Sequence, residues 1–136
     1  MLAVKTQGLV KKFGDFAAVD HLDLQVEKGE VYGLLGPNGA GKTTAIKVLA
    51  GLLKITGGEA QVLGMKVPDS GISAKLGYMP QETAMYLGLT VHQNLEFFGK
   101  LFGMKNGQIA EKEKELLDFV DLADWRDELA QNLSGG

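Results

Sequence analysis

Gly36–Thr44 reads GPNGAGKTT, and this stretch decides the fold. It fits the pattern Gly, four residues, Gly, Lys, Thr, which is typical of a phosphate-binding loop, the P-loop. Its glycines let the backbone turn tightly and direct successive N–H groups at one anion, and a helix that follows adds the positive end of its dipole. Lys42 can reach the β- and γ-phosphates of a nucleotide, and the Thr43 hydroxyl can bind Mg²⁺.

The residues on either side supply the two elements that such a loop needs. The apolar run 31–35 predicts a strand leading into the loop, and 45–53 predicts a helix after it. We expect Ile46, Leu49 and Leu53 to share the buried face of that helix. A glycine-rich turn without a ligand would not explain why a lysine and a threonine directly follow the last glycine.

Composition excludes several classes of function. The chain has 136 residues and a net charge of −3 without a basic stripe, which argues against nucleic acid as the main partner. The absence of cysteine excludes disulfides and thiolate metal sites. No apolar run approaches the ~18 residues of a membrane-spanning helix. We expect a cytoplasmic protein that reaches a membrane through a partner, with His21 and His92 isolated on its surface.

Around the loop, the pattern predicts several strands. Residues 2–12 alternate loosely and should end in a turn at 13–15, and 22–26 alternate cleanly, as in an antiparallel strand. Residues 59–63 and 76–79 predict two further short strands, the second ended by a proline.

From Thr90 onward the pattern becomes helical. Thr90 and Gln93 have the spacing of a capping box, and the helix that they begin should run to about Phe102. Its apolar face is expected to carry Leu95, Phe98 and Phe102.

A second helix is predicted over about 107–122 and a short third one over about 123–130. The charged stretch 111–115 of the second helix is expected to face solvent. Its opposite face should carry Ile109, Leu116, Phe119 and Val120.

Four further features occur in a fixed order around the P-loop. Phe13 lies upstream of it, Gln81 follows a predicted short strand, a helical insert comes next, and 133–136 reads LSGG. This order resembles the ATP-binding subunits of ABC transporters. Within that family, the run 36–53, the segment 86–90 and the helical insert look most like bacterial or archaeal exporters of the drug- and antibiotic-resistance type. The resemblance implies an α/β fold of the P-loop NTPase class, with an antiparallel β subdomain and an α-helical subdomain. It places the nucleotide-binding core at about 1–82 and the helical subdomain at about 83–136.

The resemblance also assigns roles to residues. Phe13 would stack on adenine, for which the neighbouring Phe16 could substitute, and Gln81 would bind Mg²⁺ and contact the attacking water. Lys42 and Gln81 are thus the expected catalytic residues, and Thr43 and Gln81 the expected metal ligands. The residues expected to bind ATP are Phe13, Gly36, Asn38, Gly39, Ala40, Gly41, Lys42, Thr43, Thr44, Ser134, Gly135 and Gly136.

The resemblance implies two protein partners. The LSGG motif would cap the γ-phosphate held by a second nucleotide-binding subunit, so that two subunits enclose ATP head to tail. An integral membrane permease would be the other partner.

After LSGG, the resemblance implies an apolar strand that ends in a Mg²⁺-binding aspartate and a catalytic glutamate, and then a switch histidine. No apolar run followed by Asp-Glu occurs in these 136 residues. We therefore expect the N-terminal part of a larger ATPase, without the C-terminal part of the core, that binds nucleotide but hydrolyses it slowly. Two alternatives stay open: a non-transport ABC ATPase acting on nucleic acid or ribosomes, and a nucleotide-binding module without turnover.

Overall fold

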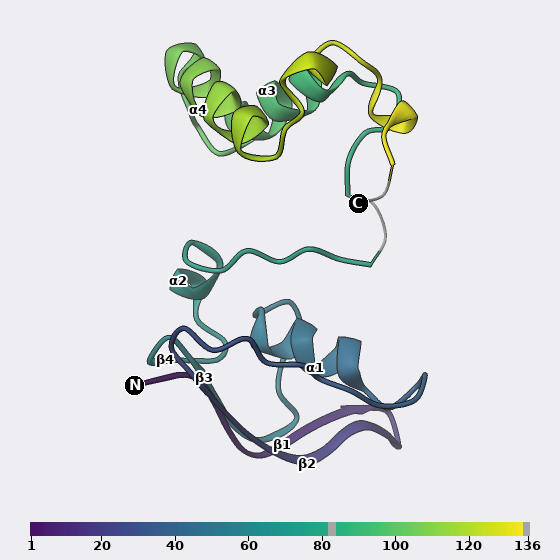
Figure 1. Cartoon of the computed structure of the whole chain (residues 1–136). Coiled ribbons are helices and arrows are strands. Elements are labelled where there is room, and N and C mark those ends of the chain that lie inside the picture. The colour runs from purple at the N-terminus through teal and green to yellow at the C-terminus, as the bar shows by residue number, and fades with distance from the viewer. Residues whose placement is uncertain (82–83, 135–136) are drawn as a thin grey trace. The chain divides into compact units, whose positions relative to one another are not determined.

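A computed structural model describes residues 1–81 and 84–134, which form two compact units (Figure 1). The first unit is Met1–Tyr78 and the second is Met79–Gly136. Each unit is described by itself below.

The first unit is built on an antiparallel sheet with the strand order β2-β1-β3-β4. A long hairpin of β1 (Leu2–Phe13) and β2 (Phe16–Glu27) forms one side, and β3 (Gly57–Val62) and β4 (Met65–Lys66) form the other. The strands predicted over 2–12, 22–26 and 59–63 are therefore confirmed, although β2 begins earlier than expected. The cause is pairing, because Phe13 lies opposite Phe16 and extends the ladder to the turn.

Helix α1 (Lys42–Leu49) packs on one face of this sheet (Figure 1). Its Ala45 and Val48 enter an apolar cluster that also contains Leu9 and Val19 from the hairpin. The predicted buried face is wrong at Ile46, whose side chain is 43% exposed, whereas Leu49 and Leu53 are partly buried. Lys42 already begins the helix, earlier than expected, and small Ala45 fits close to the sheet. The short helix α2 (Ser70–Ser73) adds Ile72 to the cluster.

Two predicted strands do not form. Residues 31–35, which lead into the P-loop, are irregular and belong to no strand, with Val31 99% and Leu35 93% exposed. Residues 76–79 are likewise irregular. An apolar run becomes a strand only when a neighbour accepts its backbone hydrogen bonds. Within the fully described first unit, the sheet consists of β1 to β4 and offers neither segment a partner.

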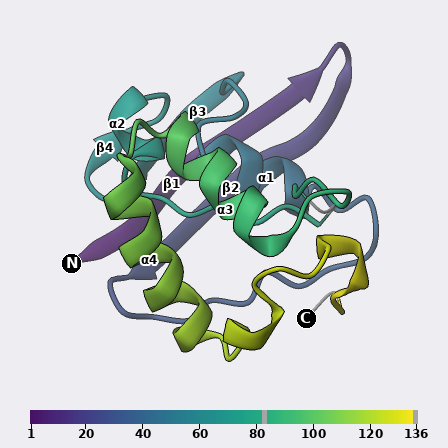
Figure 2. The same ribbon diagram turned by 90° about the horizontal axis from the view of Figure 1, so that it is seen from above.

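The second unit is helical. Helix α3 (Val91–Leu101) and helix α4 (Asn106–Phe119) lie side by side (Figures 1 and 2). The capping box of Thr90 and Gln93 is confirmed. The helices approach closely at Gly99, where a Cβ would lie only 2.8 Å from Cγ1 of Ile109. Instead of a third α-helix, two single 3₁₀ turns follow, η1 (Ala123–Trp125) and η2 (Ala130–Asn132).

The buried faces of both helices differ from the prediction. On α3, Phe102 is 82% exposed, while the polar Asn94 is buried. On α4 the buried residues are Ile109, Glu113 and Leu117. Leu116, Phe119 and Val120 are exposed instead. Glu113, which was expected to face solvent, thus lies inside because it has charged partners from elsewhere in the unit.

Candidate functional site

The P-loop owes its shape to two glycines with a left-handed backbone. Gly39 and Gly41 both have φ near 83°, a conformation that other residues rarely adopt. At position 41 a Cβ would lie 1.9 Å from the carbonyl oxygen of Ala18 in β2. Only glycine therefore allows the loop to approach the hairpin this closely.

Lys42 folds back over this loop. Its Nζ donates hydrogen bonds to the carbonyl oxygens of Gly36 at 2.7 Å and Pro37 at 2.6 Å. An ammonium group has three donors, so one remains for a ligand. The charge is therefore held over the loop, where an incoming phosphate would need it.

Helix α1 starts directly from the loop, at Lys42. Its N-cap is Gly41, which has no side chain that could bond to the first N–H groups of the helix. The first bond within the helix runs from Ala45 N–H to Gly41 O. The first N–H groups of a helix have no partner inside it. Together with Lys42, they make a donor-only cradle that suits an anion such as a triphosphate.

A hollow of about 540 Å³ adjoins the cradle. Phe16, Ala18 and Val19 from β2 line it together with Gly39–Lys42 and Leu35. Phe13 is not among the lining residues; its ring is 50% exposed and lies 4.9 Å from the Nζ of Lys11. Both aromatic residues sit at the tip of the hairpin, so the stacking role of Phe13 stays a prediction, with Phe16 beside it.

The structure brings together the loop residues predicted to bind nucleotide. Asn38, Ala40 and Thr43 are exposed, and Thr44 is half-buried in the first turn of α1. Gln81 and Ser134 belong to the second unit, and both are exposed. Gly135 and Gly136 lie outside the described residues. Among residues 1–81 and 84–134, no group of three or more His, Asp or Glu side chains could hold a metal ion.

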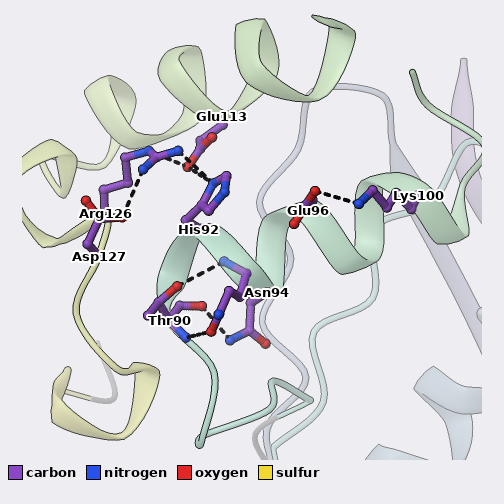
Figure 3. Close-up of polar contacts among 9 residues, drawn as sticks. Thr90, His92, Asn94, Glu96, Lys100, Glu113, Arg126 and Asp127 are labelled. Atoms are coloured by element: carbon purple, nitrogen blue, oxygen red, sulfur yellow. Dashed lines mark hydrogen bonds and ion pairs between the residues drawn. The ribbon is translucent and has the colours of Figure 1, made fainter. Parts of the chain in front are cut away.

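In the second unit, the sequence pattern missed Asn94. Its Nδ2 donates to the carbonyl oxygen of Thr90 at 3.0 Å (Figure 3). The same Nδ2 donates to the carbonyl oxygen of Tyr86 at 3.0 Å, and Oδ1 accepts from the N–H of Tyr86 at 2.9 Å. A buried amide satisfied in this way fixes the segment that leads into α3. A lone asparagine in a helical pattern gave no signal for this role.

The sequence pattern also missed an ionic cluster made by His92, Glu113 and Arg126 (Figure 3). Glu113 is only 5% exposed, and its Oε1 lies 2.8 Å from His92 Nδ1 and 3.0 Å from Arg126 Nε. The expectation that His92 is an isolated surface residue is wrong for this reason. His21 is exposed as expected, and its Nδ1 lies 2.6 Å from Oδ1 of the neighbouring Asp20.

Comparison with known proteins identifies the family. The ABC transporter family matches residues 19–136. The chain is 50% identical over 111 residues to the probable multidrug ABC transporter ATP-binding protein YbhF of Escherichia coli, covering 80% of this chain and 19% of that protein. It is 44% identical over 137 residues to the daunorubicin/doxorubicin resistance ATP-binding protein DrrA of Streptomyces peucetius, covering 98% of this chain and 41% of that protein. The chain thus spans less than half the length of these relatives.

Solved structures of ATP-binding cassettes support the same family assignment. A nucleotide-free ATP-binding cassette from an ABC transporter matches 99% of this chain with a TM-score of 0.80 and 28% identity, and the match covers 60% of that cassette. A cassette in its ADP conformation matches with a TM-score of 0.76 and 28% identity, again over 99% of this chain and 60% of that one. The expected fold class is confirmed, and the family binds nucleotide. Among residues 1–81 and 84–134, no helix is long and apolar enough to cross a membrane. The chain belongs to the ABC transporter family, as one of its ATP-binding proteins.

Proposed function

We propose that this chain is the nucleotide-binding part of a subunit that couples ATP binding and hydrolysis to export across a membrane. The observation that carries the proposal is the P-loop cradle, with Lys42 held over it and the start of α1 beneath it. The nucleotide-binding core would extend to about residue 82, and the helical subdomain would follow it.

The relatives support export as the direction of transport. YbhF is described as a multidrug transporter protein, DrrA confers daunorubicin and doxorubicin resistance, and LnrL of Bacillus subtilis confers linearmycin resistance. LnrL is 36% identical to this chain over 135 residues, 98% of this chain and 43% of LnrL. Such compounds would pass through an integral membrane permease, with the ATP-binding subunit on its cytoplasmic side.

In the proposed site, the chain's own groups orient the nucleotide. ATP would supply the phosphoryl group that is transferred to water. Lys42 would neutralise charge on its β- and γ-phosphates, and the N–H groups of the loop and of α1 would bind the phosphates. Thr43 and Gln81 are the residues that would hold Mg²⁺, which would neutralise further phosphate charge. Phe13 stacks on the adenine. Ser134, Gly135 and Gly136 contact the nucleotide of a second subunit, arranged head to tail with the first.

Efficient hydrolysis requires more than this set. A carboxylate pair that binds Mg²⁺ and orients water does not occur after an apolar strand in these 136 residues. Because phosphoryl transfer depends on such positioning, a polypeptide of these residues should bind ATP and release phosphate only at background rates.

Titration with a fluorescent ATP analogue tests the proposal. Lys42→Ala should weaken binding by about tenfold or more, since it removes the main charge at the phosphates. Lys54→Ala, which removes an exposed lysine beyond α1, is the matched control and should leave affinity unchanged. Equal affinity of Lys42→Ala and the unaltered chain would refute the site, and rapid Lys42-dependent phosphate release would refute the account of hydrolysis.

A further inference from the structure

We infer that Arg126 is a positioning residue for Ser134: held by the buried Glu113 and by His92, it sets the path of residues 126–134, here called the signature approach. The inference rests on the proposed function, because it assumes that Ser134 serves a nucleotide. Neither Arg126 nor Glu113 belongs to the predicted site.

The backbone of the signature approach runs along the start of α3. His92 N–H donates to Arg126 O at 2.9 Å, and Val91 N–H donates to Glu128 O at 3.0 Å. Farther on, Ala130 N–H donates to Leu89 O at 2.9 Å. These bonds attach the segment on one side, to residues that Asn94 already fixes.

The side chain of Arg126 attaches the signature approach to α4 as well. Its Nε lies 3.0 Å from Glu113 Oε1, its Nη2 lies 2.9 Å from His92 Nδ1, and its Nη1 lies 2.9 Å from Asp127 Oδ1 (Figure 3). The planar guanidinium can present several donors at fixed angles, which a lysine cannot. His92 Nδ1 can accept from Arg126 Nη2 or donate to Glu113 Oε1, but not both at once. The contact of the Arg126 side chain that does not depend on the His92 tautomer is the one with Glu113, and it joins the signature approach to α4.

Glu113 makes this attachment specific. Burying a carboxylate without a partner is costly, and Glu113, only 5% exposed, has Arg126 Nε at 3.0 Å. Its position on α4 is fixed by the packing of Ile109 and Leu117 on the same helical face. Arg126 is thus held by a group that itself cannot move to solvent.

Three other carboxylates near the cluster do not replace this contact. Asp118 lines a hollow with Glu113 and Arg126, but the ion pairs of Arg126 among the described residues are with Glu113 and Asp127. Glu96 of α3 is paired with Lys100 at 2.5 Å, and Asp127 is 80% exposed. Glu113 is therefore the carboxylate that ties the signature approach to α4. Beyond Arg126, Leu133 N–H bonds back to Ala130 O at 3.3 Å, so the attached path continues to the residue before Ser134.

Hydrogen–deuterium exchange of the full chain tests the inference without nucleotide. Arg126→Met should speed exchange of amides in 126–134 by about tenfold, while exchange in 1–78 stays unchanged. Lys112→Met is the matched control, because it breaks the exposed pair with Glu115 on the same unit and should change neither region.

A double variant separates positioning from stability. Arg126→Met alone leaves the Glu113 carboxylate buried without its partner, whereas Glu113→Gln/Arg126→Met removes both charges and should recover most of the thermal midpoint. The inference requires that amides in 126–134 still exchange fast in the double variant. Exchange restored to the wild-type rate would overturn it, because the pair would then matter only for stability.

A binding measurement keeps the two proposals distinguishable. Arg126→Met and the double variant should bind the fluorescent ATP analogue through Lys42 with unchanged affinity, since the P-loop lies in the other unit. A parallel loss of affinity would contradict the assignment of Arg126 to the signature approach. If instead Lys42→Ala binds as well as the unaltered chain, the proposed function fails, and the exchange result still decides the path of 126–134.

Discussion

The two units of the chain differ in what holds their interiors together. In Met1–Tyr78 the buried cluster is apolar, and Thr6 is the polar side chain buried beside it, bonded to Leu22 O at 2.8 Å. In the described part of the second unit, Asn94 and Glu113 are buried among a few apolar residues. The first interior depends on area removed from water, and the second depends on satisfied polar groups.

The two interiors should therefore be sensitive to different kinds of substitution. Apolar packing tolerates small changes of shape and loses stability in proportion to the volume removed. A buried polar contact fails as soon as one partner is lost, because the other then stays desolvated and unpaired. The proposed phosphate site stands on the first kind of interior and the signature approach on the second.

The largest loss of stability is expected from a cavity in the apolar interior of the first unit. Leu9 is fully buried in β1, and Leu9→Ala should lower the free energy of unfolding by about 2–5 kcal/mol. Urea denaturation measures it, with Leu52→Ala, 58% exposed in wild type, as the control expected to change it by less than about 0.5 kcal/mol. A loss below about 1 kcal/mol for Leu9→Ala would show that the sheet does not depend on this cluster.

In the second unit, the largest loss of stability is expected from removal of the buried Asn94 amide. Asn94→Ala removes the hydrogen bonds to Tyr86 and Thr90. The Tyr86 N–H loses its acceptor, whereas the two carbonyl oxygens keep backbone partners in Leu89 and residue 94, so the expected cost is about 1–3 kcal/mol. Asn132→Ala, which removes an exposed amide in the same unit, is the control. If both substitutions cost the same in urea denaturation, the second interior is not organised by Asn94.

A smaller effect is expected at the start of α3. Thr90→Ala removes the acceptor for Gln93 N–H and should cost about 1 kcal/mol, whereas Thr90→Ser keeps the oxygen and should cost much less. Thermal unfolding of the two variants compares them directly. Equal midpoints would mean that the segment before α3 is fixed by Asn94 alone.

The smallest effect concerns two exposed ion pairs, one in each unit. A hydrogen bond from Lys66 lowers the pKa of Glu59, and one from Lys100 lowers the pKa of Glu96. A carboxyl whose folded pKa is lowered stabilises the fold above its unfolded pKa, and this contribution is lost as the pH falls through the folded value. Both pairs are exposed, so the loss on acidification should be slight.

Denaturation at about pH 6 and about pH 3 measures this loss. Lys66→Met should reduce the pH dependence by removing the first pair, and Lys100→Met by removing the second. An unchanged difference between the two pH values in both variants would show that these pairs contribute nothing measurable to stability.

Much of the first unit could be predicted from sequence. Alternation predicted strands over 2–12 and 22–26, which form the hairpin. The spacing of the glycines, Lys42 and Thr43 predicted a tight loop that is followed directly by a helix. The strands predicted over 31–35 and 76–79 do not form, since an apolar run indicates a strand without saying whether a partner strand is present.

The second unit was harder to predict, for a physical reason. The capping box joins Thr90 to Gln93, only three residues away, so the sequence predicted it. Glu113 was assigned to solvent because periodicity treats every carboxylate as polar, and its burial depends on Arg126, which is distant in sequence. Asn94 is buried because it bonds to backbone groups of the nearby Tyr86 and Thr90, and hydrophobic periodicity does not report such bonds. The signal that could have found Glu113 is its place between Ile109 and Leu117, four residues from each.

The turn η1 places a useful residue next to the signature approach. The sequence has one tryptophan, Trp125, which immediately precedes Arg126 and is 46% exposed. Indole emission from the unlabelled chain therefore originates beside the proposed anchor, and tyrosines elsewhere can be avoided by the choice of excitation wavelength. A shift in emission on adding nucleotide would report an event near residue 126, rather than at the loop where the phosphates are proposed to bind.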